Sequence, residues 1–258
     1  MNFFSELKYL DAKTTALALK EAVSNNYLVH VANYNFDVPV DEFYSHVAET
    51  IGTVMNVDED IKTGEAKQNR WIDISYDPEI PDRYRSSNTR QPLHTDDSYV
   101  ELGNQEAVNF FYCTSQAKMG GATIFLPLDV LIDCLMIDGR KELLDQLMTT
   151  DVIFSKSSLT KTRKILDKDS KGYLCNWNYF CIDRENNSKE VITLCETFHH
   201  FLETRVVEAG LVKAVTLKPG EAVFFHDDRV IHGRNAFFVT EPKERCLIKG
   251  KVVIGTKA

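Results

Sequence analysis

Residues 218–237 read KPGEAVFFHDDRVIHGRNAF, and this stretch indicates two short β-strands joined by a turn. A Pro-Gly pair lies near its start and marks a turn, because both residues favour turn conformations of the backbone. Two apolar runs follow, at 222–225 and 230–231, and polar turn residues separate them. His232 stands at the end of the second predicted strand, directly before Gly233. The stretch therefore predicts β-structure that ends on a histidine.

The other predicted elements occur in an order that indicates a mainly β fold. Helical spacing of apolar residues occurs at 12–25, 40–53, 127–149 and 188–209. Strand patterns occur at 27–32, 107–113, 122–126, 173–182, 214–217 and 246–254. The helices do not alternate regularly with the strands, as they do in a parallel α/β fold. We therefore expect a mainly β fold with flanking helices.

The length of 258 residues is compatible with a single domain over 1–258, because barrels and sandwiches of this size commonly form one domain. Within it we expect a helical N-terminal part at about 1–55. A polar stretch at about 56–92 contains several prolines and is predicted to be a lid-like loop. Residues 151–172 are rich in Ser, Thr, Lys and Asp and are predicted to be a second, mobile loop.

Composition narrows the classes of partner. The net charge of −8 argues against a surface that binds nucleic acid. No run of about 18 apolar residues occurs, so we expect no membrane span. The first residues lack an apolar core, and none of the six cysteines forms a CxxC pair. We expect a cytoplasmic protein with reduced cysteines that acts on a small molecule. The sequence does not indicate the oligomeric state.

The segment His94-Thr95-Asp96 can form two points of a metal site together with the distant His232. Positions i and i+2 of an extended chain project to one side, so His94 and Asp96 can hold one ion. Two imidazoles and one carboxylate are the ligand set of non-heme Fe(II) oxygenases. The alternatives are a solvated turn at Asp96 and a core histidine at position 232, and His226 is a competing third ligand.

Two further residues fit the binding of an oxoacid co-substrate at such a metal. Arg245 follows His232 by thirteen residues, on the next predicted strand, and a guanidinium can pair with a distal carboxylate. Thr123 follows Gly120-Gly121 and can donate its hydroxyl to the same carboxylate. The alternatives are a surface arginine and an ordinary strand threonine.

Four segments together resemble the Fe(II)/2-oxoglutarate dioxygenases of the taurine dioxygenase and γ-butyrobetaine hydroxylase superfamily. They are LHTDDSY from position 93, GGATIF from position 120, the 218–237 stretch, and RCLIKG from position 245. The resemblance implies a double-stranded β-helix, or jelly-roll, core. One departure is visible: relatives often have Asp-Asn before the arginine of the third segment, where this chain has Asp227-Asp228.

The resemblance also implies the cofactors and the roles of residues. Fe(II), 2-oxoglutarate and O2 would be required, with His94, Asp96 and His232 as iron ligands. Arg245 would hold the distal carboxylate of 2-oxoglutarate, with Thr123 assisting. The implied reaction couples decarboxylation of 2-oxoglutarate to oxidation of a C–H bond. Hydroxylation is the default result, and desaturation and cyclisation are variants.

The substrate is expected to be a small polar metabolite, such as an amino acid, a betaine or a sulfonate. Asp97 is a candidate for an ammonium group, and Arg90 or Arg70 for a carboxylate or sulfonate. Asn178 lies in the 176–179 segment, which resembles the place where relatives present polar and aromatic residues to the substrate. The alternative for each charged residue is a solvated loop position.

Two other classes of protein remain open from the sequence. One is a jelly-roll metal protein that is not an oxygenase, such as a cupin-like isomerase or a zinc enzyme. The other is a sensing domain on a degenerate oxygenase scaffold. Arg245 distinguishes the first class, since a cupin-like isomerase does not need it.

Overall fold

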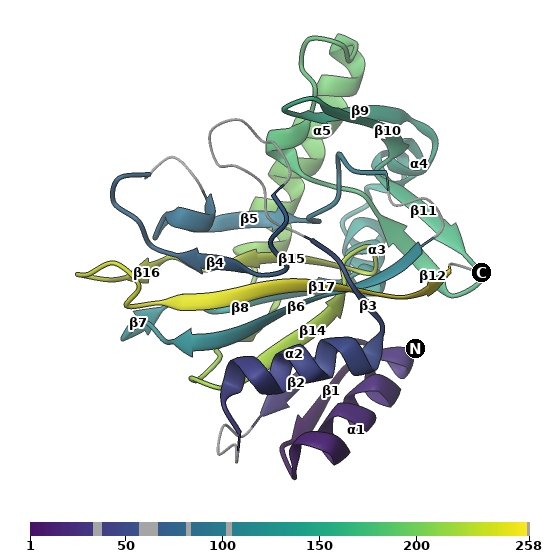
Figure 1. Cartoon of the computed structure of the whole chain (residues 1–258). Helices are drawn as coiled ribbons and strands as arrows, with labels where there is room; N and C mark the ends of the chain where they lie inside the picture. The colour runs from purple at the N-terminus through teal and green to yellow at the C-terminus, as the bar shows by residue number, and fades with distance from the viewer. Residues whose placement is uncertain (33–37, 57–66, 81–83, 102–104, 257–258) are drawn as a thin grey trace.

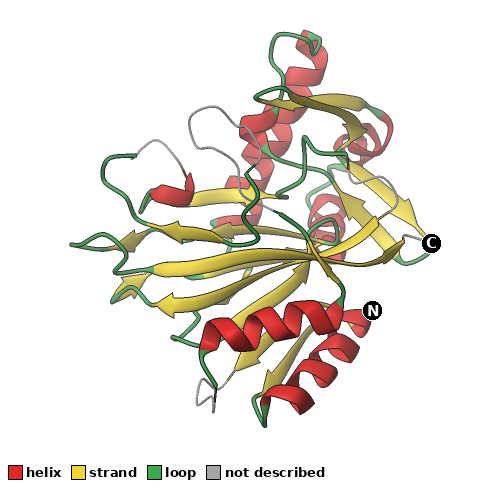
Figure 2. Cartoon of the chain, in the orientation of Figure 1, coloured by secondary structure: helices red, strands yellow, loops and turns green. Residues whose placement is uncertain are grey.

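Two β-sheets packed face to face form the centre of the molecule (Figure 1). The structure is a computed structural model, and it describes residues 1–32, 38–56, 67–80, 84–101 and 105–256. Helices cover both outer faces of this pair of sheets (Figure 2). The layers confirm the predicted mainly β fold with flanking helices, and they agree with the implied jelly-roll core.

The larger sheet contains seven strands within the described residues. Their order is β1 (Asn2–Lys8), β2 (Asn26–Ala32), β14 (Ala222–His226), β6 (Gln105–Ser115), β17 (Cys246–Thr256) and β3 (Thr53–Val54), with β4 (Ile72–Ser75) also pairing with β17. β1 and β2 are parallel, and the remaining pairs are antiparallel.

The smaller sheet carries His94 and His232, two of the predicted metal ligands. Its order is β13 (Lys213–Val215), β8 (Thr123–Pro127), β15 (Val230–Arg234) and β5 (Gln91–His94), all antiparallel. In this register His232 lies opposite His94 on one side and Phe125 on the other. Directly opposed residues project from the same face of a sheet, so these three side chains share the inner face.

Alternation along the central strands separates two apolar layers. Phe110 and Phe224 point outward and stack on each other, with their ring centroids 4.8 Å apart. They belong to an apolar cluster with residues of α1 (Ala12–Asn25) and α2 (Val40–Ile51). Their neighbours in sequence, Phe111 and Phe225, point inward into the space between the sheets, and their ring centroids lie 5.4 Å apart. Period-two alternation is what allows one strand to serve both layers.

A second helical layer covers the outer face of the smaller sheet. It consists of α3 (Leu128–Ile137), α4 (Lys141–Thr149), α5 (Lys189–Phe201) and the π-helix η3 (Leu202–Val207). These helices pack with Ile124 and Ile231, which alternate with the inward-facing residues of β8 and β15. Ser188 caps α5 by accepting a hydrogen bond from Val191 N at 3.3 Å. No helix among the described residues is both long and apolar enough to cross a membrane.

Two loop predictions need correction. Residues 151–172 contain two antiparallel hairpins, formed by β9 (Asp151–Lys156) with β10 (Leu159–Lys164) and by β11 (Leu166–Asp169) with β12 (Gly172–Cys175). Their polar composition reflects strands with one exposed face, which the loop interpretation overlooked.

The 56–92 segment also contains ordered structure: β4, the 3-10 helix η1 (Tyr84–Ser86) and β5. The parts of the predicted lid at 57–66 and 81–83 lie outside the described residues. In the N-terminal part the predicted strand at 27–32 is present as β2, and β1 is an additional strand that the sequence pattern did not indicate; the two flank α1 and extend the larger sheet. Phe3 and Phe4 of β1 pack partly buried against the inner cluster, which accounts for this strand.

Candidate active site

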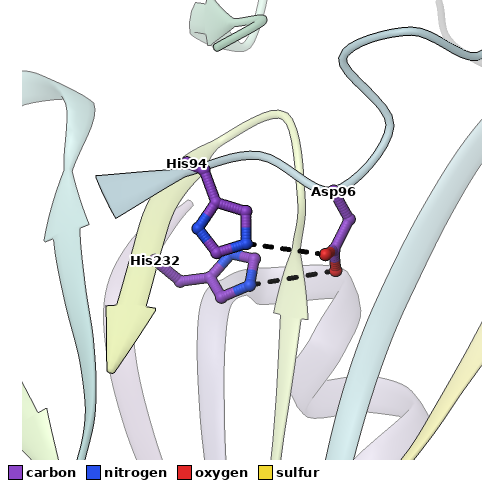
Figure 3. Close-up of side chains that lie close together, drawn as sticks. All are labelled: His94, Asp96 and His232. Atoms are coloured by element: carbon purple, nitrogen blue, oxygen red, sulfur yellow. Dashed lines mark ion pairs between the residues drawn. The ribbon is translucent and has the colours of Figure 1, made fainter. Parts of the chain in front are cut away.

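His94, Asp96 and His232 converge at one buried point between the sheets (Figure 3). The two rings come from opposed positions of β5 and β15, and their centroids lie 4.3 Å apart. Asp96 follows β5 by two residues, with Oδ1 at 3.7 Å from His94 Nε2 and Oδ2 at 3.8 Å from His232 Nε2. One ligand atom from each of the three lies within 4.8 Å of the others, so a single ion can contact all three.

Thr95 holds the backbone of the His94-Thr95-Asp96 segment in place through hydrogen bonds to Trp177. Thr95 N donates to Trp177 O at 2.6 Å, and Trp177 N donates to Thr95 Oγ1 at 3.0 Å. Trp177 is buried against Phe198 of α5, with ring centroids 4.8 Å apart. Thr95 therefore faces away from the cluster, and its two neighbours face into it, as the i, i+2 spacing predicted.

Hydrogen bonding to the backbone indicates which ring nitrogen of His94 carries the proton. His94 Nδ1 lies 2.9 Å from Pro92 O, and a carbonyl only accepts, so in the neutral ring Nδ1 carries the proton and Nε2 has the lone pair. Burial, with a smaller effect of His94, holds the pKa of His232 well below its usual value. Neutral imidazoles are the form that binds metals, so the donor set suits Fe(II).

Asp96 is kept ionised by groups that the sequence analysis did not find. Lys249 Nζ lies 2.7 Å from Asp96 Oδ2, and Asn109 Nδ2 donates to the same oxygen at 2.9 Å. Burial alone would raise the pKa of Asp96, but the ammonium of Lys249 is the largest opposing effect, and the pKa is held well below its usual value. The signal was the two lysines, Lys249 and Lys251, within the mostly apolar predicted strand at 246–254, because lysine is rarely buried without a partner.

Gln91 also reaches the metal-facing side of the cluster. Its Nε2 lies 3.1 Å from His94 Nε2 and donates to that nitrogen's lone pair. A bound metal ion would take the same lone pair, so the amide of Gln91 would then be available to another group at the site.

Arg245 and Thr123 line one pocket together with Gly121, Cys113 and Leu247. Arg245 donates from Nε and Nη2 to Gly121 O, at 3.2 and 3.0 Å. Its Nη1 is buried and has no hydrogen-bond partner among the described residues. Burial lowers the pKa of Arg245 to about 10. A buried guanidinium with an unused donor fits an anionic ligand, because an unpaired buried charge is costly.

Gly121 is required for the approach of Arg245. Its φ is +76°, a left-handed value that favours glycine, and a Cβ there would lie 2.7 Å from Arg245 Nε. The Gly-Gly pair before Thr123 therefore has a steric reason that the sequence alone did not give.

The proposed substrate residues do not gather at the cluster. Arg90 pairs with Glu203 of η3. Arg70 pairs with Glu49 at 3.3 Å, and both side chains are exposed. Asn178 caps the short 3-10 helix η2 (Tyr179–Cys181) by accepting from Phe180 N at 3.1 Å.

Asp97 is close to the cluster, but its charge is already used. Both of its carboxylate oxygens contact Lys251 Nζ. The assignment of Asp97 to a substrate ammonium is therefore not supported, because a lysine of the chain occupies that place. His226, the competing third ligand, points elsewhere: its Nε2 lies 2.7 Å from Val23 O.

Two buried imidazoles and one carboxylate on the inner face of a double β-sheet are the ligand set of a non-heme iron oxygenase. The chain belongs to the taurine catabolism dioxygenase TauD, TfdA family, whose model matches residues 4–250. Family membership favours the oxygenase over the cupin-like isomerase and the sensing domain. No curated protein sequence matches the chain significantly.

Solved structures share the fold at low identity. PvcB from Pseudomonas aeruginosa is 16% identical, with a TM-score of 0.65, and the match covers 97% of this chain and 86% of that one. A taurine dioxygenase from Burkholderia xenovorans is 12% identical, with a TM-score of 0.65 and coverage of 98% and 88%. An asparagine oxygenase is 10% identical, with a TM-score of 0.65 and coverage of 94% and 79%.

Proposed function

We propose that this protein couples decarboxylation of 2-oxoglutarate to oxidation of a C–H bond in a small polar metabolite, with hydroxylation as the default result. His94, Asp96 and His232 hold Fe(II), and Arg245 with Thr123 holds the distal carboxylate of 2-oxoglutarate. The observation that carries the proposal is the unused, buried Nη1 of Arg245 in a pocket that Thr123 also lines. The solved asparagine oxygenase was captured with Fe(II), hydroxyasparagine and succinate, which fits this type of reaction.

The protein's own groups bind and orient the metal, the co-substrate and the substrate, and they exclude water from the site. Fe(II) with 2-oxoglutarate and O2 supplies the oxidising power, and succinate and CO2 are the co-products. Asn109 and Lys249 hold the Asp96 carboxylate in place. The ring of Phe111 lies 5.9 Å from that of His232 and keeps one side of the site apolar.

Lys249 replaces Arg90 and Arg70 as the candidate for an anionic group of the substrate. Its side chain is 14% exposed and pairs with Asp96 Oδ2 beside the other metal ligands, whereas both arginines are paired away from them. An ammonium has three donors, so Lys249 can contact a substrate anion while it stays paired with Asp96. A carboxylate or sulfonate on the substrate is the class of group that a buried ammonium recognises. Gln91 adds a neutral amide on the same side.

The test is an anaerobic absorption titration of the metal-free protein with Fe(II) and then with 2-oxoglutarate. A weak visible charge-transfer band that needs both components is the expected result. Succinate release with taurine, asparagine, arginine and γ-butyrobetaine then screens for the substrate. A folded, Fe(II)-loaded protein without the band contradicts the proposed function.

Lys249→Met is expected to raise the substrate KM about 10- to 100-fold, because it removes a charge-assisted hydrogen bond worth about 1.5–3 kcal/mol. Fe(II) affinity is expected to fall as well, because Lys249 also keeps the Asp96 carboxylate ionised and in place. Succinate release against substrate concentration measures the first effect, and the Fe(II) titration measures the second. Lys243→Met, at an exposed lysine, is the matched control. An unchanged KM removes Lys249 from the substrate site.

A further inference from the structure

We propose that Asp227 is a positioning residue that ties the metal-binding segments together and sets the orientation of His232. This inference rests on the proposed iron site. Asp227 lies in the turn between β14 and β15, and the turn leads into the strand that carries His232. It is buried, and its carboxylate faces the segment that carries the other two ligands.

The Asp227 carboxylate accepts two backbone hydrogen bonds from the segment after His94. Asp96 N donates to Oδ1 at 2.9 Å, and Asp97 N donates to Oδ2 at 3.1 Å. The two residues joined by the first bond are 131 positions apart in the chain. One side chain therefore fixes the backbone of a ligand residue against the β14–β15 turn.

The same carboxylate faces the far side of the His232 ring. Its Oδ1 lies 3.8 Å from His232 Nδ1, and this nitrogen has no hydrogen-bond partner among the described residues. Metal-bound histidines usually donate their second N–H to a carboxylate or a carbonyl, which fixes the tautomer. His94 uses the carbonyl of Pro92 for this purpose, and the Asp227 carboxylate, 3.8 Å away, is placed to serve His232 in the same way once a metal ion orients the ring.

Two backbone N–H groups thus donate to one side chain and the ring nitrogen of His232 faces it, and only a carboxylate can accept from all three. An asparagine would turn its NH2 group toward one of these donors. The neighbouring Asp228 has a different role in the fold, since its backbone carbonyl accepts from Cys175 N at 2.9 Å. Asp228→Asn is therefore the matched control, and it introduces the residue that relatives often carry.

The experiment titrates parent, Asp227→Asn and Asp228→Asn with Co(II), without 2-oxoglutarate, and follows the d–d absorption. We expect Asp227→Asn to bind Co(II) about 10- to 100-fold more weakly, and Asp228→Asn to bind like the parent. The Co(II)-induced rise in Tm provides a second measure of affinity if Asp227→Asn is less stable. Asp227→Glu restores a carboxylate and is expected to recover part of the affinity.

Proton NMR of the Co(II) forms tests the orientation of His232 directly. The parent and Asp228→Asn are expected to show one shifted, exchangeable N–H signal for each ligand imidazole, and Asp227→Asn is expected to lose that of His232. A merely structural role would lower stability without removing one signal selectively. Equal Co(II) affinity and intact signals in Asp227→Asn would overturn the inference. A parent that binds no metal would overturn the proposed function, and with it the role of Asp227.

Discussion

Replacing His232 with alanine is expected to abolish metal-dependent succinate formation and the charge-transfer band. The imidazole supplies one of the three ligand atoms that lie within 4.8 Å of one another, and the described residues offer no other group to this cluster. The contribution of a catalytic metal is several kcal/mol, so we expect a rate loss on the order of 1,000-fold or more. Burial keeps this imidazole neutral, which makes it a ready ligand.

The measurement is succinate release at saturating Fe(II) and 2-oxoglutarate, together with an anaerobic Fe(II) titration. His46→Ala is the control, because His46 is exposed on α2, remote in the fold from the smaller sheet. Far-UV circular dichroism establishes that the variant remains folded. A His232→Ala protein that retains parental Fe(II) affinity would exclude His232 from the ligand set.

Arg245→Ala is expected to weaken 2-oxoglutarate binding while leaving Fe(II) or Co(II) affinity unchanged. The lost contact is a buried, charge-assisted pair, and truncating one partner of such a pair costs about 2–5 kcal/mol, on the order of 30-fold to more than 1,000-fold. The dissociation constant comes from the intensity of the charge-transfer band at increasing 2-oxoglutarate. The result separates this residue from His232, whose loss removes the metal itself.

Two companion variants test the geometry at Arg245. Arg245→Lys keeps the positive charge but loses the planar fork, so it is expected to restore only part of the affinity. Gly121→Ala keeps the arginine but places a Cβ 2.7 Å from its Nε, and we expect a loss of 2-oxoglutarate affinity in the same direction. Parental affinity in Arg245→Ala would show that another cation holds the co-substrate.

The sequence was sufficient for the parts of the site that depend on local geometry. An extended His-x-Asp places both side chains on one face whatever surrounds it, and the two apolar runs around the 226–229 turn are read directly as strands. The mainly β fold and the helices α1, α2 and α5 follow from the same periodicities. The hairpins at 151–172 were missed because a half-exposed strand has the composition of a loop.

The partners of the charged residues could not be predicted from the sequence. Arg90, Arg70 and Asp97 lie near the metal motif in sequence or within the polar loop, which makes them candidates, but each is paired within the chain. Lys249 and Asn109 were missed because their place beside Asp96 depends on how β17 and β6 face the smaller sheet. A lysine within a predicted strand indicates that it has a partner, but no local pattern of the sequence identifies that partner.

The sequence by itself thus determined the ligand types, the order of the motifs and the class of fold, since backbone periodicity and chemical identity are local properties. Only the tertiary structure decided which charges meet at the metal ligands, because strand register and sheet packing bring together residues separated by most of the chain. Asp227 illustrates both: it lies in the stretch that predicts the fold, but its contacts with Asp96 and Asp97 exist only once β5 lies beside β15.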